Sequence, residues 1–308
     1  MAGGGFFHNY FYGKSGKKDF TEADLPKTRL QLFFEVFKVR CGSMIGLNVL
    51  YLLIWIPAII WTFIHIVQLN LIMSKGDFII ADLFGLLYSY LLVMFPLTAI
   101  TGPFTAGASY VMRNWARDEH SFVWADFKHG MKQNWKQALA YSVIDGAFPL
   151  IAFLCIYFYT GMAGGSMLFY LPMAVIVIVY VLWSLVKMAI PPMIVSYKLK
   201  FGQVIKNSIL ITLTALPKAI LAKLITLIVP ILLALFNLFI PGAASWATAI
   251  GIALYAILML SFNRLVIASY AYAAFEKYIN PMIDGAQMDI GLQSRRNARD
   301  NTENEDKK

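Results

Sequence analysis

Long apolar runs separated by short polar connections are the main pattern in this chain. A run of about 18 or more apolar residues is long enough, as a helix, to cross a bilayer core of about 30 Å. Six runs reach that length and contain few charges. They cover residues 44–69, 83–100, 139–159, 168–190, 220–239 and 247–268. The pattern predicts an all-α integral membrane protein with six transmembrane helices.

Composition agrees with this prediction and argues against a soluble globular domain. Of the 308 residues, 59% are hydrophobic and 14% are charged, whereas soluble domains contain about 25% charged residues. The first apolar run starts only at Met44 and is too long for the core of a secretory signal. Cys41 and Cys155 are separated by a membrane leaflet in this arrangement, so we expect them to be packing residues and not a disulfide.

The positions of the basic residues predict the orientation in the membrane. Apart from Lys75, every lysine and arginine lies before the first apolar run, in residues 101–138 or 187–223, or after residue 263. Because basic loops stay on the cytoplasmic side, we expect both termini to be cytoplasmic. The net charge of +9 is explained by attraction to anionic lipids of the inner leaflet and requires no nucleic acid.

These features divide the chain into three predicted regions. Residues 1–29 form a cytoplasmic N-terminal segment, residues 30–277 a six-helix membrane domain, and residues 278–308 a cytoplasmic tail. We expect the tail to be largely disordered, because residues 289–308 contain almost no apolar side chain.

A short repeated pattern divides the membrane domain further. A phenylalanine is followed five residues later by a lysine at Phe33, Phe127 and Phe201, and at no other phenylalanine. Each pair precedes two apolar runs and then a Ser-Tyr dipeptide. We therefore expect three units, each an amphipathic cytoplasmic helix followed by a transmembrane hairpin. Such repeats are common in transporters but also build purely structural bundles, so they leave the function open.

The stretch from Ser109 to Trp135 concentrates charged and aromatic side chains between two apolar runs. Within it, aromatic residues recur at helical spacing and three lysines form a neighbouring stripe. This pattern is typical of a helix that lies along the membrane interface, with its lysines at lipid phosphates. We expect this surface and a later cytoplasmic helix to bind lipid headgroups or a protein partner. The candidate residues are Tyr110, Arg113, Arg117, Trp124, Asp126, Phe127, Lys128, Lys132, Asn134, Trp135, Lys136 and Lys206.

Acidic and histidine side chains in the same stretch raise the question of catalysis. These side chains are Asp118, Glu119, His120, Asp126 and His129. Three adjacent residues of a helix cannot all point at one ion, and the chain has no HExxH motif. It also lacks a glycine-rich phosphate loop and a GxSxG elbow. We therefore expect no enzymatic activity, no metal site and no cofactor.

Ionisable residues inside the apolar runs are the other candidates for function. A charge in hydrocarbon costs about 3 kcal/mol or more unless it is paired, and Asp145 lies well inside the third run. Lys223 and Arg264 lie at a similar depth and are its predicted cationic partners. The pair then either fixes the helix register or forms a proton or solute site. Asn48 is expected to form hydrogen bonds between helices.

One segment, Gly102 to Leu139, resembles the signature region of the YesL family of bacterial membrane proteins. It reads "GPFTAGASYVMRNWARDEHSFVWADFKHGMKQNWKQAL", and its Gly-Pro, Ser-Tyr, Trp-x-Asp-Phe and Lys-x-Asn-Trp-Lys patterns carry the resemblance. Two further segments, "FFEVFKVRCGSMIGLNVLYLL" and "PPMIVSYKLKFGQVIKN", extend the likeness over most of residues 30–275. The resemblance implies a six-span protein of the bacterial plasma membrane. Because genes of this family often lie beside those of sugar ABC transporters and sensors, it also implies a role in carbohydrate uptake, but it supplies no binding residues.

Three functional hypotheses follow from the sequence. The first is a non-enzymatic accessory protein of a carbohydrate ABC-transport or sensing system, whose subunits contact the helices at 109–136 and 198–212. The second is a stand-alone transporter or permease-like protein coupled through Asp145 and a cationic partner. The third, a membrane enzyme that uses residues 118–129, has the least support. Lipids of the anionic inner leaflet are expected partners in every case.

Overall fold

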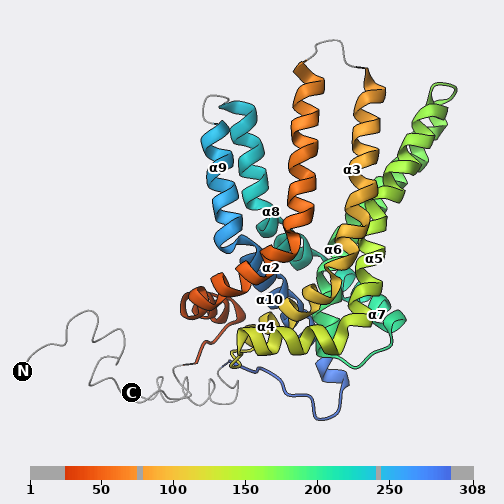
Figure 1. The fold of residues 1–308 in the computed structure, drawn as a ribbon. Coiled ribbons are helices and arrows are strands. Elements are labelled where there is room, and N and C mark those ends of the chain that lie inside the picture. Colours follow the sequence, from red (N-terminus) through yellow and green to blue (C-terminus); the bar gives the residue numbers. More distant parts are fainter. Residues whose placement is uncertain (1–24, 75–78, 241–243, 293–308) are drawn as a thin grey trace, which may run out of the picture.

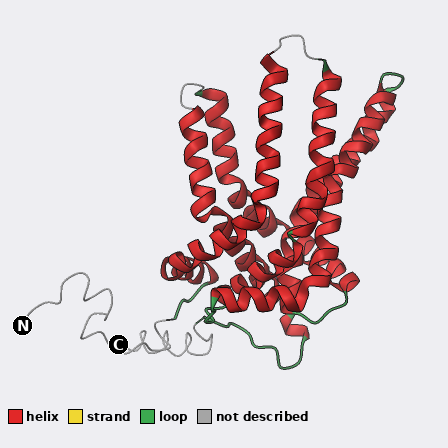
Figure 2. Cartoon of the chain, in the orientation of Figure 1, coloured by secondary structure: helices red, strands yellow, loops and turns green. Residues whose placement is uncertain are grey.

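The computed structural model describes residues 25–74, 79–240 and 244–292. Residues 1–24 and 293–308, and with them most of the predicted N-terminal segment and tail, lie outside the described residues. The described chain forms helices and short loops, without a strand (Figure 2). Its α-helices are α2 (Arg29–Ser74), α3 (Ile80–Ile100), α4 (Gly102–Ala116), α5 (Val123–Ala163), α6 (Tyr170–Ser196), α7 (Phe201–Thr214), α8 (Leu216–Phe239), α9 (Ala244–Leu254) and α10 (Leu260–Tyr278).

Six helical stretches of the described chain are long and apolar enough to cross a membrane. The first five predicted runs fall in α2, α3, α5, α6 and α8, and the sixth falls in α9 and α10. A helix suits a bilayer because it pairs its backbone N–H and C=O groups within itself. The prediction of an all-helical chain with six candidate membrane-spanning helices is confirmed.

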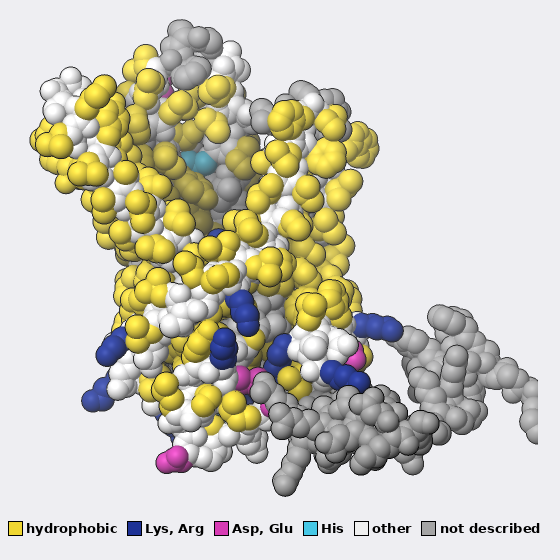
Figure 3. Space-filling model, turned by 180° about the vertical axis from the view of Figure 1, so that it is seen from behind, with side chains coloured by type: hydrophobic (Ala, Val, Ile, Leu, Met, Phe, Trp, Pro, Cys, Tyr) yellow, Lys and Arg dark blue, Asp and Glu magenta, His cyan; other side chains and the backbone are white. Residues whose placement is uncertain are grey.

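Three helical hairpins rise from a common base (Figure 1). They consist of α2 with α3, α5 with α6, and α8 with α9, and their far ends stand apart. The base contains α4, α7 and α10. In the space-filling view, lysine and arginine side chains gather on the base, and apolar side chains cover two lobes with a hollow between them (Figure 3). The basic charge of the described chain is therefore concentrated at one end.

The three predicted units differ in how the amphipathic segment joins the hairpin. In the first two units, α2 and α5 each continue without a break from the amphipathic segment into the membrane-spanning segment. In the third unit, Ala215 separates α7 from α8. A common repeat architecture therefore stays a prediction.

The buried core of the described chain lies mainly in the base. One cluster of buried side chains joins α6, α7, α8 and α10 and includes Ile190, Val204 and Phe275. A second cluster joins α2, α4 and α10 and includes Trp115 and Leu265. Helix α10 contributes to both because its buried residues lie on most sides of the helix, as expected of a helix in the centre of a protein.

Helix α4 packs antiparallel to the first half of α5, and the two backbones approach closely. A Cβ atom added to Gly102 would overlap the Ser142 side chain and the α5 backbone. A Cβ atom added to Gly107 would lie 2.6 Å from the Phe127 carbonyl oxygen. Small residues allow such packing at many helix contacts in membranes. The Ser142 hydroxyl also donates to the Ala99 carbonyl at 2.6 Å, which joins the end of α3 to α5.

A buried amide on α2 stabilises the last membrane-spanning stretch. A π-helical segment, Tyr255–Met259, lies between α9 and α10, and such a segment disturbs the regular pairing of backbone groups. Asn48 Nδ2 donates to the carbonyls of Tyr255 at 3.0 Å and Ala256 at 2.8 Å. Asn48 Oδ1 accepts from the Ser261 N–H at 3.0 Å. The predicted interhelical role of Asn48 is confirmed.

The two described ends of the chain meet at the base. Arg29, the first residue of α2, forms an ion pair with Glu276 of α10 and donates to the Ile290 carbonyl at 2.9 Å. Leu292 packs against the core cluster that contains Trp115. The start of the predicted tail, up to Leu292, is thus held by contacts where the sequence predicted disorder.

We expect Gly102→Ala to lower the free energy of unfolding by about 1–3 kcal/mol, because the added methyl group overpacks the contact between α4 and α5. The matched control is Gly46→Ala in α2, where an added Cβ meets no atom within 4 Å. This change is expected to be neutral or stabilising, by up to about 1 kcal/mol. Thermal unfolding of the detergent-solubilised protein measures both variants, and equal midpoints would contradict the close packing.

Candidate functional site

Asp145 on α5 forms an ion pair with Lys187 on α6 inside the second hairpin. Lys187 Nζ lies 3.1 Å from Oδ1 and 3.3 Å from Oδ2 of the carboxylate. Trp183 Nε1 donates to Oδ1 at 3.1 Å, and the Tyr141 hydroxyl donates to Oδ2 at 3.5 Å. The carboxylate is therefore both paired and hydrogen bonded, which is how a charge is tolerated at membrane depth.

This cation differs from the two that the sequence predicts. Neither Lys223 nor Arg264 forms an ion pair with Asp145 in the described chain, and Lys187 takes that place. A signal for Lys187 does exist in the sequence, because Asp145 and Lys187 are equally far from Ser166 in the turn between α5 and α6. In an antiparallel hairpin such positions lie side by side. The sequence interpretation assigned Lys187 to the cytoplasmic boundary and so missed it.

Arg264 on α10 has a different partner. Its Nη2 donates to the Tyr51 hydroxyl on α2 at 2.7 Å, and its guanidinium lies over the Tyr51 ring, 5.2 Å from the centroid. Because the Tyr51 oxygen accepts from Arg264, its own proton is free for Thr105 Oγ1 on α4, 2.7 Å away. A chain of hydrogen bonds thus links α10, α2 and α4.

A cavity of about 350 Å³ opens beside the Asp145–Lys187 pair. Its lining comes from α2, α5, α6, α8, the π-helical segment and α10, so all three hairpins contribute. Lys223 and Arg264 both line it. The structure therefore brings the three predicted intramembrane residues to one site, although not as the predicted ion pair. The cavity has the size of small-molecule sites, which are about 300–1,000 Å³.

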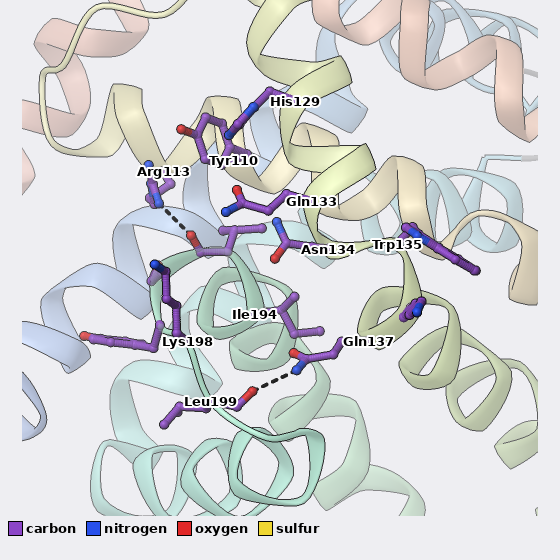
Figure 4. Close-up of a pocket in the computed structure, with 14 residues that line it drawn as sticks. Tyr110, Arg113, His129, Gln133, Asn134, Trp135, Gln137, Ile194, Lys198 and Leu199 are labelled. Atoms are coloured by element: carbon purple, nitrogen blue, oxygen red, sulfur yellow. Dashed lines mark hydrogen bonds between the residues drawn. The ribbon is translucent and has the colours of Figure 1, made fainter.

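A second cavity, of about 800 Å³, lies in the base between α4, α5 and the end of α6. Arg113 Nη1 donates to the Val195 carbonyl at 2.6 Å, and Gln137 Nε2 donates to the Leu199 carbonyl at 2.8 Å (Figure 4). The first bond satisfies a carbonyl group in the last turn of α6, where helical partners run out, and the second a carbonyl group of the link between α6 and α7. Two polar side chains of this cavity therefore stabilise the fold.

Most of the predicted docking residues do lie at the surface of the base. Those that line the larger cavity are Tyr110, Arg113, Asn134, Trp135 and Lys136. Those that are exposed elsewhere are Trp124, Lys128, Lys132 and Lys206. In Figure 4, Trp135 points away from the other labelled side chains. Its indole lies 5.6 Å from Lys136 Nζ, which places an aromatic and a cationic group together at the surface.

Two of the predicted docking residues, Phe127 and Arg117, instead contact other residues of this chain. Phe127 is 4% exposed and belongs to the same core cluster as Trp115. The sequence pattern places Phe127 at the lipid boundary, but the close approach of α4 covers it. Arg117 lies 3.0 Å from Glu119 and 5.6 Å from the Tyr272 ring centroid. These contacts account for the arginine without a partner molecule.

The acidic and histidine residues of the stretch have separate partners. Asp126 accepts hydrogen bonds from the Ser121 hydroxyl at 2.6 Å and from the Phe122 N–H at 2.9 Å, directly before α5. His129 packs edge-on against Tyr110, and His120 packs against a neighbouring phenylalanine. The described residues contain no group of three His, Cys, Asp or Glu that could hold a metal ion.

The family described as "Protein of unknown function, DUF624" matches residues 44–159. The match begins in the membrane-spanning half of α2 and ends in α5, so it contains Asp145 but not Lys187 or the later cations. It fits an uncharacterised family and does not name YesL. No curated protein and no solved structure matches the chain.

We expect Asp145→Asn and Lys187→Gln each to lower the unfolding midpoint, because each change leaves a polar or charged partner unpaired in the membrane. The double variant should lose less than the sum of the two, with a coupling energy of about 0.5–3 kcal/mol. Lys218→Gln is the matched control, since Lys218 is exposed on α8 and outside the cavity. Additive effects of the two changes would show that the pair contributes nothing.

Proposed function

We propose that this chain is a non-enzymatic, multi-pass protein of the bacterial plasma membrane that binds a small solute beside Asp145 and Lys187 and acts as a transporter or permease-like protein. The observation that carries this proposal is the cavity, because side chains from all three hairpins line it and the second hairpin, α8 and α10 contribute its charged groups. An ion pair that only fixed the register of α5 and α6 would require neither Lys223 nor Arg264 beside it.

The arrangement of the hairpins supports passage of a solute. The cavity is lined by helices of all three hairpins, whose far ends stand apart (Figure 1). Many transporters bind their substrate between repeated units and rock these units around the site. Pro230 of α8 also lines the cavity, and a proline weakens the backbone hydrogen bonding of its helix and allows bending there.

The distribution of charge supports a cytoplasmic base. Lysine and arginine side chains gather on the base (Figure 3), and basic segments are retained on the cytoplasmic side. The contact of Arg29 with Glu276 and Ile290 brings the two described ends to this same side. Both observations favour cytoplasmic termini.

A cysteine at Thr226 tests whether water reaches the cavity. In a chain whose Cys41 and Cys155 are replaced by serine, we expect a small charged methanethiosulfonate reagent to label Thr226→Cys in intact cells or in inverted vesicles. The physical reason is that a solute site must open to water on at least one side, and Thr226 lines the cavity.

The matched control for this experiment is Ile228→Cys. Ile228 lies on the same helix at nearly the same depth, is 54% exposed and does not line the cavity. In a bilayer it faces lipid and is expected to stay unlabelled. Absence of labelling at Thr226→Cys from both sides would contradict a solute-binding cavity.

A second candidate function is an accessory role in a carbohydrate ABC-transport or sensing system, as the resemblance to the YesL family implies. The observation in its favour is the surface of the base, where an open cavity of about 800 Å³ adjoins exposed aromatic and basic side chains. A surface with large aromatic groups and few buried charges is typical of protein contacts. Trp124 and Trp135 are the tryptophans of this surface, 62% and 47% exposed.

Under this second candidate, purification in mild detergent from the native membrane should recover ABC-transporter subunits, identified by mass spectrometry. A variant with Trp124→Ala and Trp135→Ala should lose them, because large aromatic side chains supply much of the binding energy at such contacts. The matched control is Trp246→Ala, which removes an exposed tryptophan near the start of α9, a helix of the third hairpin and not of the base. Repeated recovery of the protein alone would count against the accessory role.

A further inference from the structure

The cavity beside Asp145 carries more positive charge than its own carboxylate neutralises. Three cations line it, namely Lys187, Lys223 and Arg264, and Asp145 is the one carboxylate of the lining. The formal charge of the lining is therefore +2. Asp145 is already paired with Lys187 at 3.1 Å. Lys223 and Arg264 form no ion pair with any residue that the structure describes.

The cavity also has more hydrogen-bond donors than acceptors among the described residues. Arg264 donates to a neutral phenol, Tyr51, and to no other described residue. Trp55 Nε1 is a buried donor without a partner in the described chain, and Trp55 lines the cavity. Lys223 Nζ likewise has no hydrogen-bond acceptor among the described residues. Both oxygens of Asp145, in contrast, already accept hydrogen bonds.

We propose that the cavity binds a small organic anion through a carboxylate or phosphate group placed between Lys223 and Arg264. The inference rests on the proposed function and adds the chemical class of the solute. An anionic group supplies both the negative charge and the acceptors that the lining lacks. A guanidinium matches the two oxygens of such a group, and a lysine acts as a mobile point charge beside it.

The competing ligand classes fit this lining less well. A cationic solute would approach three cations and find the single carboxylate occupied. A neutral sugar would supply acceptors but leave two cations without a counter-charge at membrane depth, where unpaired charge is costly. Because the unpaired donors of Lys223 and Arg264 are cationic, the cavity favours a ligand that carries negative charge as well as hydrogen-bond acceptors.

The same chemistry can reach the cavity from two sources. One is a soluble metabolite with a carboxylate or phosphate, and the other is the headgroup of an anionic lipid. The volume of about 350 Å³ suits a molecule of monosaccharide size or a single headgroup. If the cavity binds a lipid headgroup, an anionic lipid in the bilayer will compete with a soluble anion; if it binds a soluble metabolite, the lipid composition will not alter binding.

The test uses the full chain in nanodiscs of phosphatidylcholine, titrated calorimetrically with glucuronate, glucose and inorganic phosphate. Glucuronate and glucose differ in one carboxylate, so they form a matched pair of probes. We expect glucuronate to bind about tenfold or more tightly than glucose, because it adds a charge-assisted contact. Phosphate should compete with glucuronate.

A second titration in nanodiscs that contain phosphatidylglycerol distinguishes the two sources of the anion. Weaker binding of glucuronate in these nanodiscs assigns the site to a lipid headgroup, and equal binding assigns it to a soluble anion.

Substitutions test whether glucuronate binds at Lys223 and Arg264. Lys223→Gln and Arg264→Gln should each weaken binding of glucuronate by about tenfold or more. Lys223→Arg should retain it, since the charge is kept. Lys218→Gln, which removes an exposed lysine five residues earlier on the same helix, should leave it unchanged. The unfolding midpoint of each variant shows whether a loss of binding arises from misfolding, and Lys223→Arg provides the comparison where a neutral variant does not fold.

The outcomes separate this inference from the proposed function. Equal binding of glucose and glucuronate would overturn the anion site and leave a solute-binding cavity. No binding of any probe in either lipid would also overturn it, whatever the labelling of Thr226→Cys shows. Binding of glucuronate that survives both glutamine variants would place the anion elsewhere and overturn the assignment. Failure of Thr226→Cys to react from either side is the distinct result that contradicts the proposed function itself.

Discussion

Inside a membrane, backbone polar groups must find their partners within the protein, and the Asn48 amide meets this requirement where the last membrane-spanning stretch departs from α-helical geometry. It bonds two carbonyls and one N–H around the π-helical segment Tyr255–Met259. An inserted π-helical turn rotates the residues that follow it relative to those before it. Arg264 lies five residues after this segment, so the π-helical turn that Asn48 stabilises helps to set which face of α10 meets the cavity.

Two kinds of polar group therefore coexist at membrane depth. Asn48 and Asp145 have every strong hydrogen-bonding requirement met by described neighbours, and these contacts join helices. Lys223 and Arg264 do not, although they line the same cavity as Asp145. A protein that needed only internal stability would have no use for these additional cations, because uncompensated charge destabilises the folded state in hydrocarbon. The anion proposed above would supply the counter-charge that these two cations lack among the described residues.

The membrane architecture follows directly from the sequence, because a run of apolar residues long enough to cross a bilayer has few other stable structures. The importance of Asp145 also follows, since an unpaired carboxylate is costly there. To identify Lys187 as its partner, one needs the register of α5 against α6, which depends on where the turn between them lies. Helical periodicity places Phe127 and Trp124 on one stripe but does not say that α4 covers the first and leaves the second exposed. The π-helical segment could not be predicted from its own residues, because the side chain that stabilises it, Asn48, lies 207 residues away in the sequence.

The position of the Asp145–Lys187 pair within one hairpin has a consequence for how the chain enters the membrane. During synthesis α5 and α6 are complete before α8 and α10 exist, so no later helix is available to neutralise either charge. Because both residues belong to the same hairpin and their charged groups lie 3.1 Å apart, the membrane-spanning part of the hairpin, residues 139–190, has no formal net charge before the later helices are made. Lys223 and Arg264 arrive last, and their charge accumulates only as the cavity closes around them.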